Sequence, residues 1–246
     1  GRKKEIYKNR PGQTIAPQRV ENLFRDFDDL SQAFLVGDHR EYNTLLVWPN
    51  FEARPELRKL SPEEMQHVVS SLVASANRFL APFERVVAFR VLDRALDVEH
   101  GELTHKLTFK REVVEKNWKT LIDGMYQHRA LSLSVDGIGL RIPNWVLREI
   151  GALQHEVSLR DGLLVAGDRT LPVGTDPAAP GALRVGDLAY AVDSVLDLGA
   201  LLARPSLWLG NEALRRFLGD EAFLALVGRR RKRSGDLRID PRLWTP

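Results

Sequence analysis

Basic side chains cluster at two places in the sequence. These clusters are the residues best suited to binding an anionic ligand. One is the opening stretch GRKKEIYKNR (1–10), which runs into a Pro-Gly pair, and the other is RRRKR (229–233). Such clusters bind anions, but they are also typical of a solvated surface. The chain has no cysteine, its six histidines show no metal-ligand spacing, and it has no Gly-x-Ser-x-Gly stretch. The sequence therefore indicates no metal centre, no thiol chemistry and no serine hydrolase.

The bulk composition is that of a globular protein. The chain has 246 residues, of which 43% are hydrophobic and 28% charged, enough for one or two domains. The net charge is only +3, and a nucleic-acid binder needs a broader basic face, so no DNA or RNA partner is expected. We expect RRRKR to be a solvated tail, with an anionic membrane surface as the alternative. Without cysteine, and without an uncharged apolar run of about 18–20 residues, the chain fits a cytoplasmic protein with possible peripheral membrane contact.

Residues 1–126 alternate helical and strand patterns. Ser61, followed by a proline and by Glu64, has the spacing of a capping box at a helix start. The patterns predict, in order, a helix from Pro17, a hairpin of 31–38 and 41–50, a helix from Ser61, a strand at 85–93 and a helix at 111–126. This half is expected to be a small α+β domain, a short sheet with flanking helices.

Residues 127–246 have a different character. Lysine nearly disappears after Lys119, and two runs, 131–142 and 156–167, carry Asp-Gly at the tip of a predicted hairpin. Helices are expected at about 194–203 and 211–227. We predict a mostly β domain with C-terminal helices, divided from the first near residue 127. We draw no family resemblance from its motifs, and a regulatory or partner-docking module is the default expectation.

Four segments of the first half carry a family resemblance. GRKKEIYKNRPGQTIAPQRVE (1–21) resembles the hinge motif of the AMP-forming adenylate ligases, and among them the long-chain fatty acyl-CoA synthetases. Three later segments are similar, in the same order, to later parts of that family: QAFLVGDHREYNTLLVWP (32–49), FLAPFERVVAFRVLD (79–93) and HGELTHKLTFKREVVEKNWKTLIDGMY (100–126). The resemblance implies that residues 1–126 are the small mobile C-terminal domain of such a ligase, beginning at the hinge that follows a large N-terminal domain.

The resemblance also implies roles for residues in the opening stretch. Arg2 matches the arginine that contacts the nucleotide ribose, and Lys4 is placed in the same nucleotide-binding motif. Lys8, Gly12 and Gln13 fall in the loop that lines the channel for the pantetheine arm of coenzyme A. Glycine permits a positive φ and a close backbone approach there. The sequence Arg-Pro-Gly replaces the commoner Gly-Gly pair of the family in this loop.

The adenylation lysine has three candidate positions. Gapless alignment with the long-chain branch places it at Thr108, a related Leu-Thr-x-Lys form places it at Lys106, and Lys110 is the third possibility. A lysine is required because attack of a carboxylate on ATP builds negative charge that a mobile ammonium stabilises. We choose Lys106.

The resemblance implies part of an ATP-dependent acyl-CoA ligase that forms an acyl-adenylate and then a thioester, inactive without its N-terminal domain. ATP or AMP with Mg²⁺, held mainly by that N-terminal domain, and coenzyme A are the expected cofactors. A carboxylic acid, by the resemblance a fatty acid, is the expected substrate. The alternative is a non-catalytic, adenylation-derived interaction or regulatory module.

Overall fold

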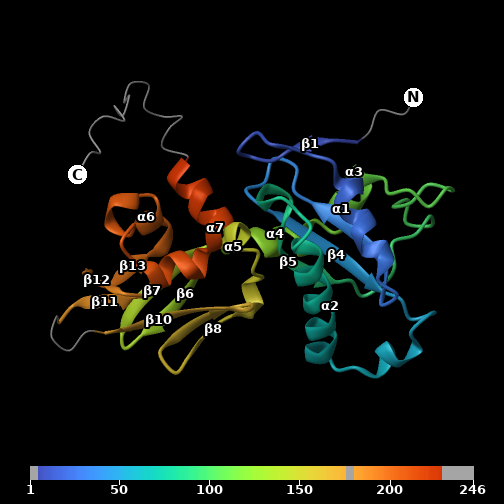
Figure 1. Ribbon diagram of the computed structural model, residues 1–246. Helices are drawn as coiled ribbons and strands as arrows, with labels where there is room; N and C mark the ends of the chain where they lie inside the picture. The colour runs from blue at the N-terminus through green and yellow to red at the C-terminus, as the bar shows by residue number, and fades with distance from the viewer. Residues whose placement is uncertain (1–4, 176–179, 229–246) are drawn as a thin grey trace.

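The computed structural model describes residues 5–175 and 180–228 (Figure 1). Arg2, Lys4 and the basic run 229–233 lie outside the described residues. The described residues of the first half (residues 1–126) lie at the right of Figure 1, and those of the second half (residues 127–246) lie at the left. Among the described helices, none has the length and apolar character needed to cross a membrane.

A three-stranded sheet forms the centre of the first half. It consists of β3 (Leu30–Val36), β4 (Asn43–Pro49) and β5 (Val86–Val91), with β4 antiparallel to β3 and parallel to β5. The hairpin expected at 31–38 and 41–50 and the strand expected at 85–93 are therefore confirmed. The other regular elements of this half are β1 (Tyr7–Lys8), β2 (Thr14–Ile15), α1 (Pro17–Leu23), α2 (Pro62–Asn77), α3 (Arg111–Asn117), α4 (Lys119–Tyr126) and 3-10 turns at Phe24–Asp26, Pro55–Lys59 and Pro82–Glu84.

Both faces of this sheet are buried, which explains its nearly continuous apolar strands. Successive side chains of a strand point to opposite faces. Leu35 and Leu45 pack in one core with α1 and α2, whereas Phe34, Val36 and Leu46 pack in another with α3 and α4. The sheet is thus the middle layer between two sets of helices.

The start of α2 confirms the predicted capping box. The backbone N–H of Glu64 donates to Ser61 Oγ at 3.2 Å, and the Ser61 N–H donates to the Glu64 carboxylate at 2.8 Å. Two of the N–H groups that every helix leaves unpaired at its start are satisfied in this way.

The single helix expected at 111–126 is wrong, because the chain forms two helices that meet at Trp118. The backbone of Trp118 has φ −101° and ψ 18°, outside helical geometry. Its indole N–H donates to the buried Glu102 carboxylate at 2.9 Å. Helical periodicity in the sequence gives no sign of this tertiary hydrogen bond.

The second half contains two sheets joined by helices. Its elements are β6 (Ala130–Val135), β7 (Ile138–Pro143), α5 (Asn144–Ile150), β8 (Val157–Arg160), β9 (Leu163–Ala166), β10 (Arg169–Thr175), β11 (Ala182–Val185), β12 (Leu188–Ala191), β13 (Val195–Asp197), α6 (Leu198–Leu202), α7 (Glu212–Gly228) and 3-10 turns at Gln154–Glu156 and Pro205–Leu207. The strand orders are β13-β7-β6 and β12-β11-β10-β9-β8. The mixed α+β class, with a β-rich second half, is as expected.

Local signals in the second half were accurate at the turns and less accurate in the helices. Asp136 and Asp161 have φ of 49° and each precedes a glycine of positive φ, so both Asp-Gly hairpins are confirmed. The helix expected at 194–203 is shorter, because strand β13 occupies its first residues and pairs with β7. The helix expected at 211–227 is present as α7, kinked at Gly219.

Candidate functional site

Lys106 lies at the tip of a short loop formed by residues 101–110, called here the lysine loop. An isolated bridge pairs Leu103 with Phe109, and the Thr104 N–H donates to the Thr108 carbonyl at 2.9 Å. The two threonine hydroxyls also lie 2.7 Å apart. Lys106 is exposed, and the following Leu107 is 70% exposed with φ of 56°. The loop therefore presents an ammonium group to solvent on a hairpin-like support.

The base of the lysine loop is fixed by one buried carboxylate, Glu102. Both of its oxygens accept hydrogen bonds from Arg94, at 2.7 and 2.8 Å, and Asn117 and Trp118 donate to it as well. Burial favours a raised pKa for Glu102, but the hydrogen bonds from Arg94 and Asn117 outweigh it and hold that pKa below its usual value. The Lys110 N–H donates to the Glu102 carbonyl at 2.7 Å, which closes the loop.

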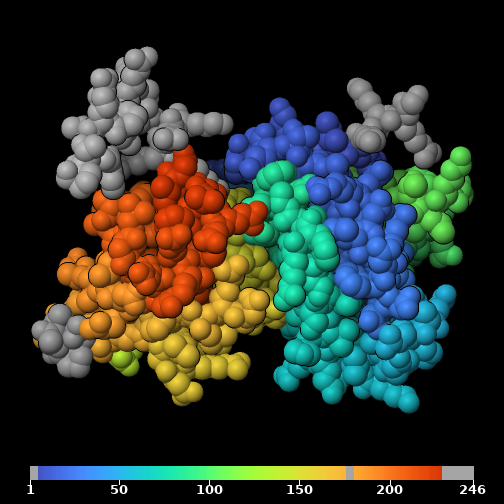
Figure 2. Space-filling view, viewed as in Figure 1, coloured from blue at the N-terminus to red at the C-terminus, as the bar shows by residue number. Residues whose placement is uncertain are grey.

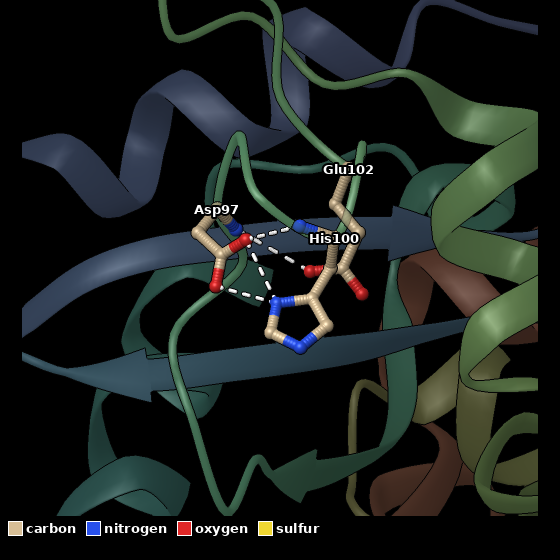
Figure 3. Close-up of side chains that lie close together, drawn as sticks. All are labelled: Asp97, His100 and Glu102. Atoms are coloured by element: carbon tan, nitrogen blue, oxygen red, sulfur yellow. Dashed lines mark hydrogen bonds and ion pairs between the residues drawn. The ribbon is translucent and has the colours of Figure 1, made fainter.

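Asp97, His100 and Glu102 bring ligand-capable atoms within 4.8 Å of one another (Figure 3). The Asp97 carboxylate contacts His100 Nδ1 at 2.8 Å, and the Glu102 oxygens are bonded to Arg94. Mg²⁺ prefers carboxylate oxygens that are free to coordinate it. This cluster therefore fits an anchor for the loop rather than a magnesium site.

The residues expected in the coenzyme A channel lie on a second loop, Lys8–Gln13, called here the glycine loop. It connects the two short strands β1 and β2. The buried Asn9 organises it: the Asn9 side chain accepts from the Gln13 N–H at 2.8 Å, and its carbonyl accepts from the Gly12 N–H at 2.9 Å. Gly12 has φ of +88°, a conformation that glycine adopts without strain, and open space surrounds it. Lys8, Gly12 and Gln13 are all exposed.

Arg111 connects the region of the lysine loop with the chain that precedes the glycine loop. Its guanidinium donates to Glu5, to the Leu35 carbonyl and to the buried Glu21 on α1. Burial raises the pKa of Glu21 although Arg111 favours its charged form. Spacing in the sequence could not have revealed this network, because Glu21 and Arg111 lie 90 positions apart.

A separate groove of about 910 Å³ lies between α2 and the strands β8 and β9. In Figure 2 it follows the seam between α2, in teal, and the yellow strands. Its lining includes Ser70, which contacts His155 Nε2, and burial lowers the pKa of that histidine. Lys106 and the glycine loop do not contribute to this groove.

Comparisons with known proteins identify the first half. Residues 9–130 match the model of the family described as "AMP-binding enzyme C-terminal domain". That part of the chain therefore belongs to this domain family, which confirms the resemblance seen in the sequence.

Similar curated proteins are ligases. The long-chain-fatty-acid–CoA ligase FadD15 of Mycobacterium tuberculosis is 28% identical over 139 residues, covering 51% of this chain and 23% of the relative. Long-chain-fatty-acid–CoA ligase 5 of Rattus norvegicus is 29% identical over 140 residues, covering 51% and 20%. Long-chain-fatty-acid–CoA ligase 1 of Homo sapiens is 24% identical, also covering 51% and 20%. The chain thus spans between a fifth and a quarter of the length of these relatives.

Similar solved structures include adenylation domains of carboxylic acid reductases. The A-PCP didomain from Segniliparus rugosus in complex with AMP has a TM-score of 0.44 at 19% identity, covering 51% of this chain and 17% of the other. The adenylation domain from Mycobacterium chelonae has a TM-score of 0.45 at 20% identity, covering 50% and 19%.

Proposed function

We propose that the first half is the mobile C-terminal domain of an AMP-forming acyl-CoA ligase that activates a carboxylic acid, by the similarity a fatty acid. The family match over residues 9–130 is the observation that carries the proposal. The polypeptide would act with an N-terminal adenylation domain that binds ATP and supplies most of the site. This chain contributes the lysine loop and the glycine loop, and by itself it is not expected to have ligase activity.

Lys106 is proposed as the adenylation lysine because of its place in the loop. Thr108 bonds to Thr104, and Lys110 stands at the N-cap position of α3 at the base of the loop, so Lys106 is the candidate at the exposed tip. When the domain closes, its ammonium would enter the nucleotide site and stabilise the negative charge that develops on the carboxylate and the α-phosphate.

The glycine loop is proposed to act in the second half-reaction. Rotation of the domain would withdraw Lys106 and present Lys8, Gly12 and Gln13 to the arm of coenzyme A. The φ of +88° at Gly12 fits this role, because glycine adopts this conformation without strain and lets a ligand approach the backbone closely. Arg2 and Lys4 remain predicted nucleotide contacts at the hinge.

The test uses the natural polypeptide that contains these residues. Lys106→Ala is expected to reduce acid-dependent ATP–pyrophosphate exchange about 100- to 1,000-fold, the usual loss when one transition-state donor is removed. Transfer from a presynthesised acyl-adenylate to coenzyme A should be retained. Lys110→Ala is the matched control and should leave exchange nearly unchanged.

The reverse pattern would assign the role to Lys110. Full exchange in both variants would refute the use of this loop and favour the non-catalytic interaction module. The observation that favours the non-catalytic module is that Thr108 stands at the position where gapless alignment expects the adenylation lysine.

A further inference from the structure

The two halves share a continuous interior rather than a flexible linker. The connection between α4 and β6 is three residues long, and Asn144 at the start of α5 fixes it. The Asn144 amide donates to the His128 carbonyl at 2.7 Å and to the Tyr42 hydroxyl at 2.9 Å. Tyr42 and Val87 pack in the core of the second half. Movement of one half against the other would therefore expose apolar surface and break buried hydrogen bonds.

Arg148 on α5 reaches from the second half to the turn between β3 and β4. Its side chain is 6% exposed, and Nη1 donates to the Glu41 carbonyl at 2.8 Å. Nη2 donates at 2.7 Å to the neighbouring Glu149, whose side chain is 1% exposed. The guanidinium is a rigid fork, so a bond through one nitrogen fixes the direction of the other. Arg148 thereby fixes the position of the Glu41 backbone.

The same β3–β4 turn supports the glycine loop from the other side. The His39 N–H donates to the Lys8 carbonyl at 2.9 Å, and the Arg10 N–H donates to the Arg40 carbonyl at 2.8 Å. The Arg10 guanidinium bonds to the Glu41 carboxylate at 2.9 Å. Glu41 is therefore held by the glycine loop through its side chain and by the second half through its carbonyl.

We infer that the second half braces the glycine loop, and that Arg148 is a positioning residue that acts on this loop through Glu41. The function of the second half is then structural support for the glycine loop, the face that receives the thiol. Both halves then rotate as one body. The consequence for coenzyme A rests on the proposed function, whereas the brace itself rests on the contacts alone. The lysine loop lies on the opposite side of the first half from the second half, so the brace does not act on Lys106 (Figure 1).

Amide hydrogen exchange on this chain tests the brace without any activity. Arg148→Met is expected to raise the exchange rates of the Arg10 and His39 amides by about tenfold or more, because a charge-assisted bond to their support is lost. The matched control is Arg85→Met. Arg85 is another interface arginine, and its bonds go to the Arg148 and Glu149 carbonyls and to the Glu221 carboxylate rather than to the β3–β4 turn. The Arg85→Met variant should leave the exchange rates of the Arg10 and His39 amides within about twofold of those of the parent.

Loss of a cation beside the buried Glu149 could unfold the Arg148→Met variant. Arg148→Lys is therefore measured as well, since it retains the charge but its single ammonium cannot reproduce the fork. Faster exchange at Arg10 and His39 in a folded variant supports the inference. Unchanged rates at both amides in a folded variant overturn it, whatever the activity.

A kinetic measurement on the natural polypeptide separates the brace from the proposed function. Arg148→Met should raise the KM for coenzyme A while ATP–pyrophosphate exchange stays at the parental rate. If the parent shows no ligase activity but Arg148→Met still speeds amide hydrogen exchange at Arg10 and His39, the proposed function fails and the brace stands. Equal losses in both half-reactions would show a general structural defect and would overturn a specific role on the glycine loop.

Discussion

Replacement of Glu102 by glutamine tests whether one buried carboxylate holds the base of the lysine loop. The side chain of Glu102 is fully buried, and it accepts bonds from both terminal nitrogens of Arg94 and from Trp118. Glutamine has nearly the same shape but no charge, and its NH₂ group faces donors. The change therefore removes an ion pair and leaves donors without an acceptor.

The expected loss follows from the exposure of the two partners. Breaking a buried ion pair by removing one partner costs about 3–5 kcal/mol when the other charge stays buried. The Arg94 side chain is 33% exposed, so water recovers part of this cost. The remaining amide oxygen of glutamine still accepts one bond. We expect Glu102→Gln to lower the free energy of unfolding by about 2–3 kcal/mol, a large fraction of a typical domain stability.

Urea denaturation of the chain measures this loss, with Glu99→Gln, a change at an exposed carboxylate three residues away, as the control. The pH dependence gives a second readout. The pKa of Glu102 lies below its ordinary value of 4.5 in the folded chain, so its contribution is present above pH 4.5 and is lost as the pH falls further. The variant should lack this acid-dependent component. A loss within about 0.5 kcal/mol of the control, the usual range for surface changes, would refute the reasoning, as would an unchanged acid profile.

Two further predictions concern the interior near the glycine loop and the tyrosines. Gly37→Ala should destabilise the chain by about 1–3 kcal/mol in thermal or urea unfolding, since the new Cβ would clash with Asn43 Oδ1 and lie 2.6 Å from the Tyr7 hydroxyl. Stability equal to that of the parent would contradict this packing, and Gly124→Ala, where nothing lies nearby, is the control. Burial raises the pKa of all four tyrosines above 10.0: Tyr7, Tyr42, Tyr126 and Tyr190. Because the folded state resists ionisation, stability should fall as pH rises above 10, and ultraviolet titration at about pH 10.5 should show far less tyrosinate than in denaturant. Equal tyrosine titration curves for the folded chain and for the chain in denaturant would contradict the raised pKa values.

Local signals predicted the parts of this protein that depend on a few neighbouring residues. The Ser61 capping box and both Asp-Gly hairpins form as expected, because each is decided by hydrogen bonds or backbone preferences within four residues. The family motif located both candidate loops. These features need no knowledge of the distant chain.

Patterns that depend on tertiary partners were less predictable. At Trp118 the backbone leaves helical dihedral angles, although its N–H still bonds to the Val114 carbonyl, and its indole donates to Glu102, 16 residues earlier. Strand β13 replaces the first part of a predicted helix because its backbone pairs with β7, more than 50 residues away. In each case a distant partner supplies hydrogen bonds that local propensity cannot anticipate.

The sequence by itself determined the family of the first half, the α+β class and the identity of the residues at the two loop tips. The tertiary structure decided which side chains hold those tips in place. Glu102 under the lysine loop and Arg148 behind the glycine loop are charged groups that burial alone would disfavour. Such buried groups need partners that complete their hydrogen bonds. Arg94 and Glu149 are near them in sequence, but Trp118 and the Glu41 carbonyl, 16 and 107 positions away, are brought near by the fold.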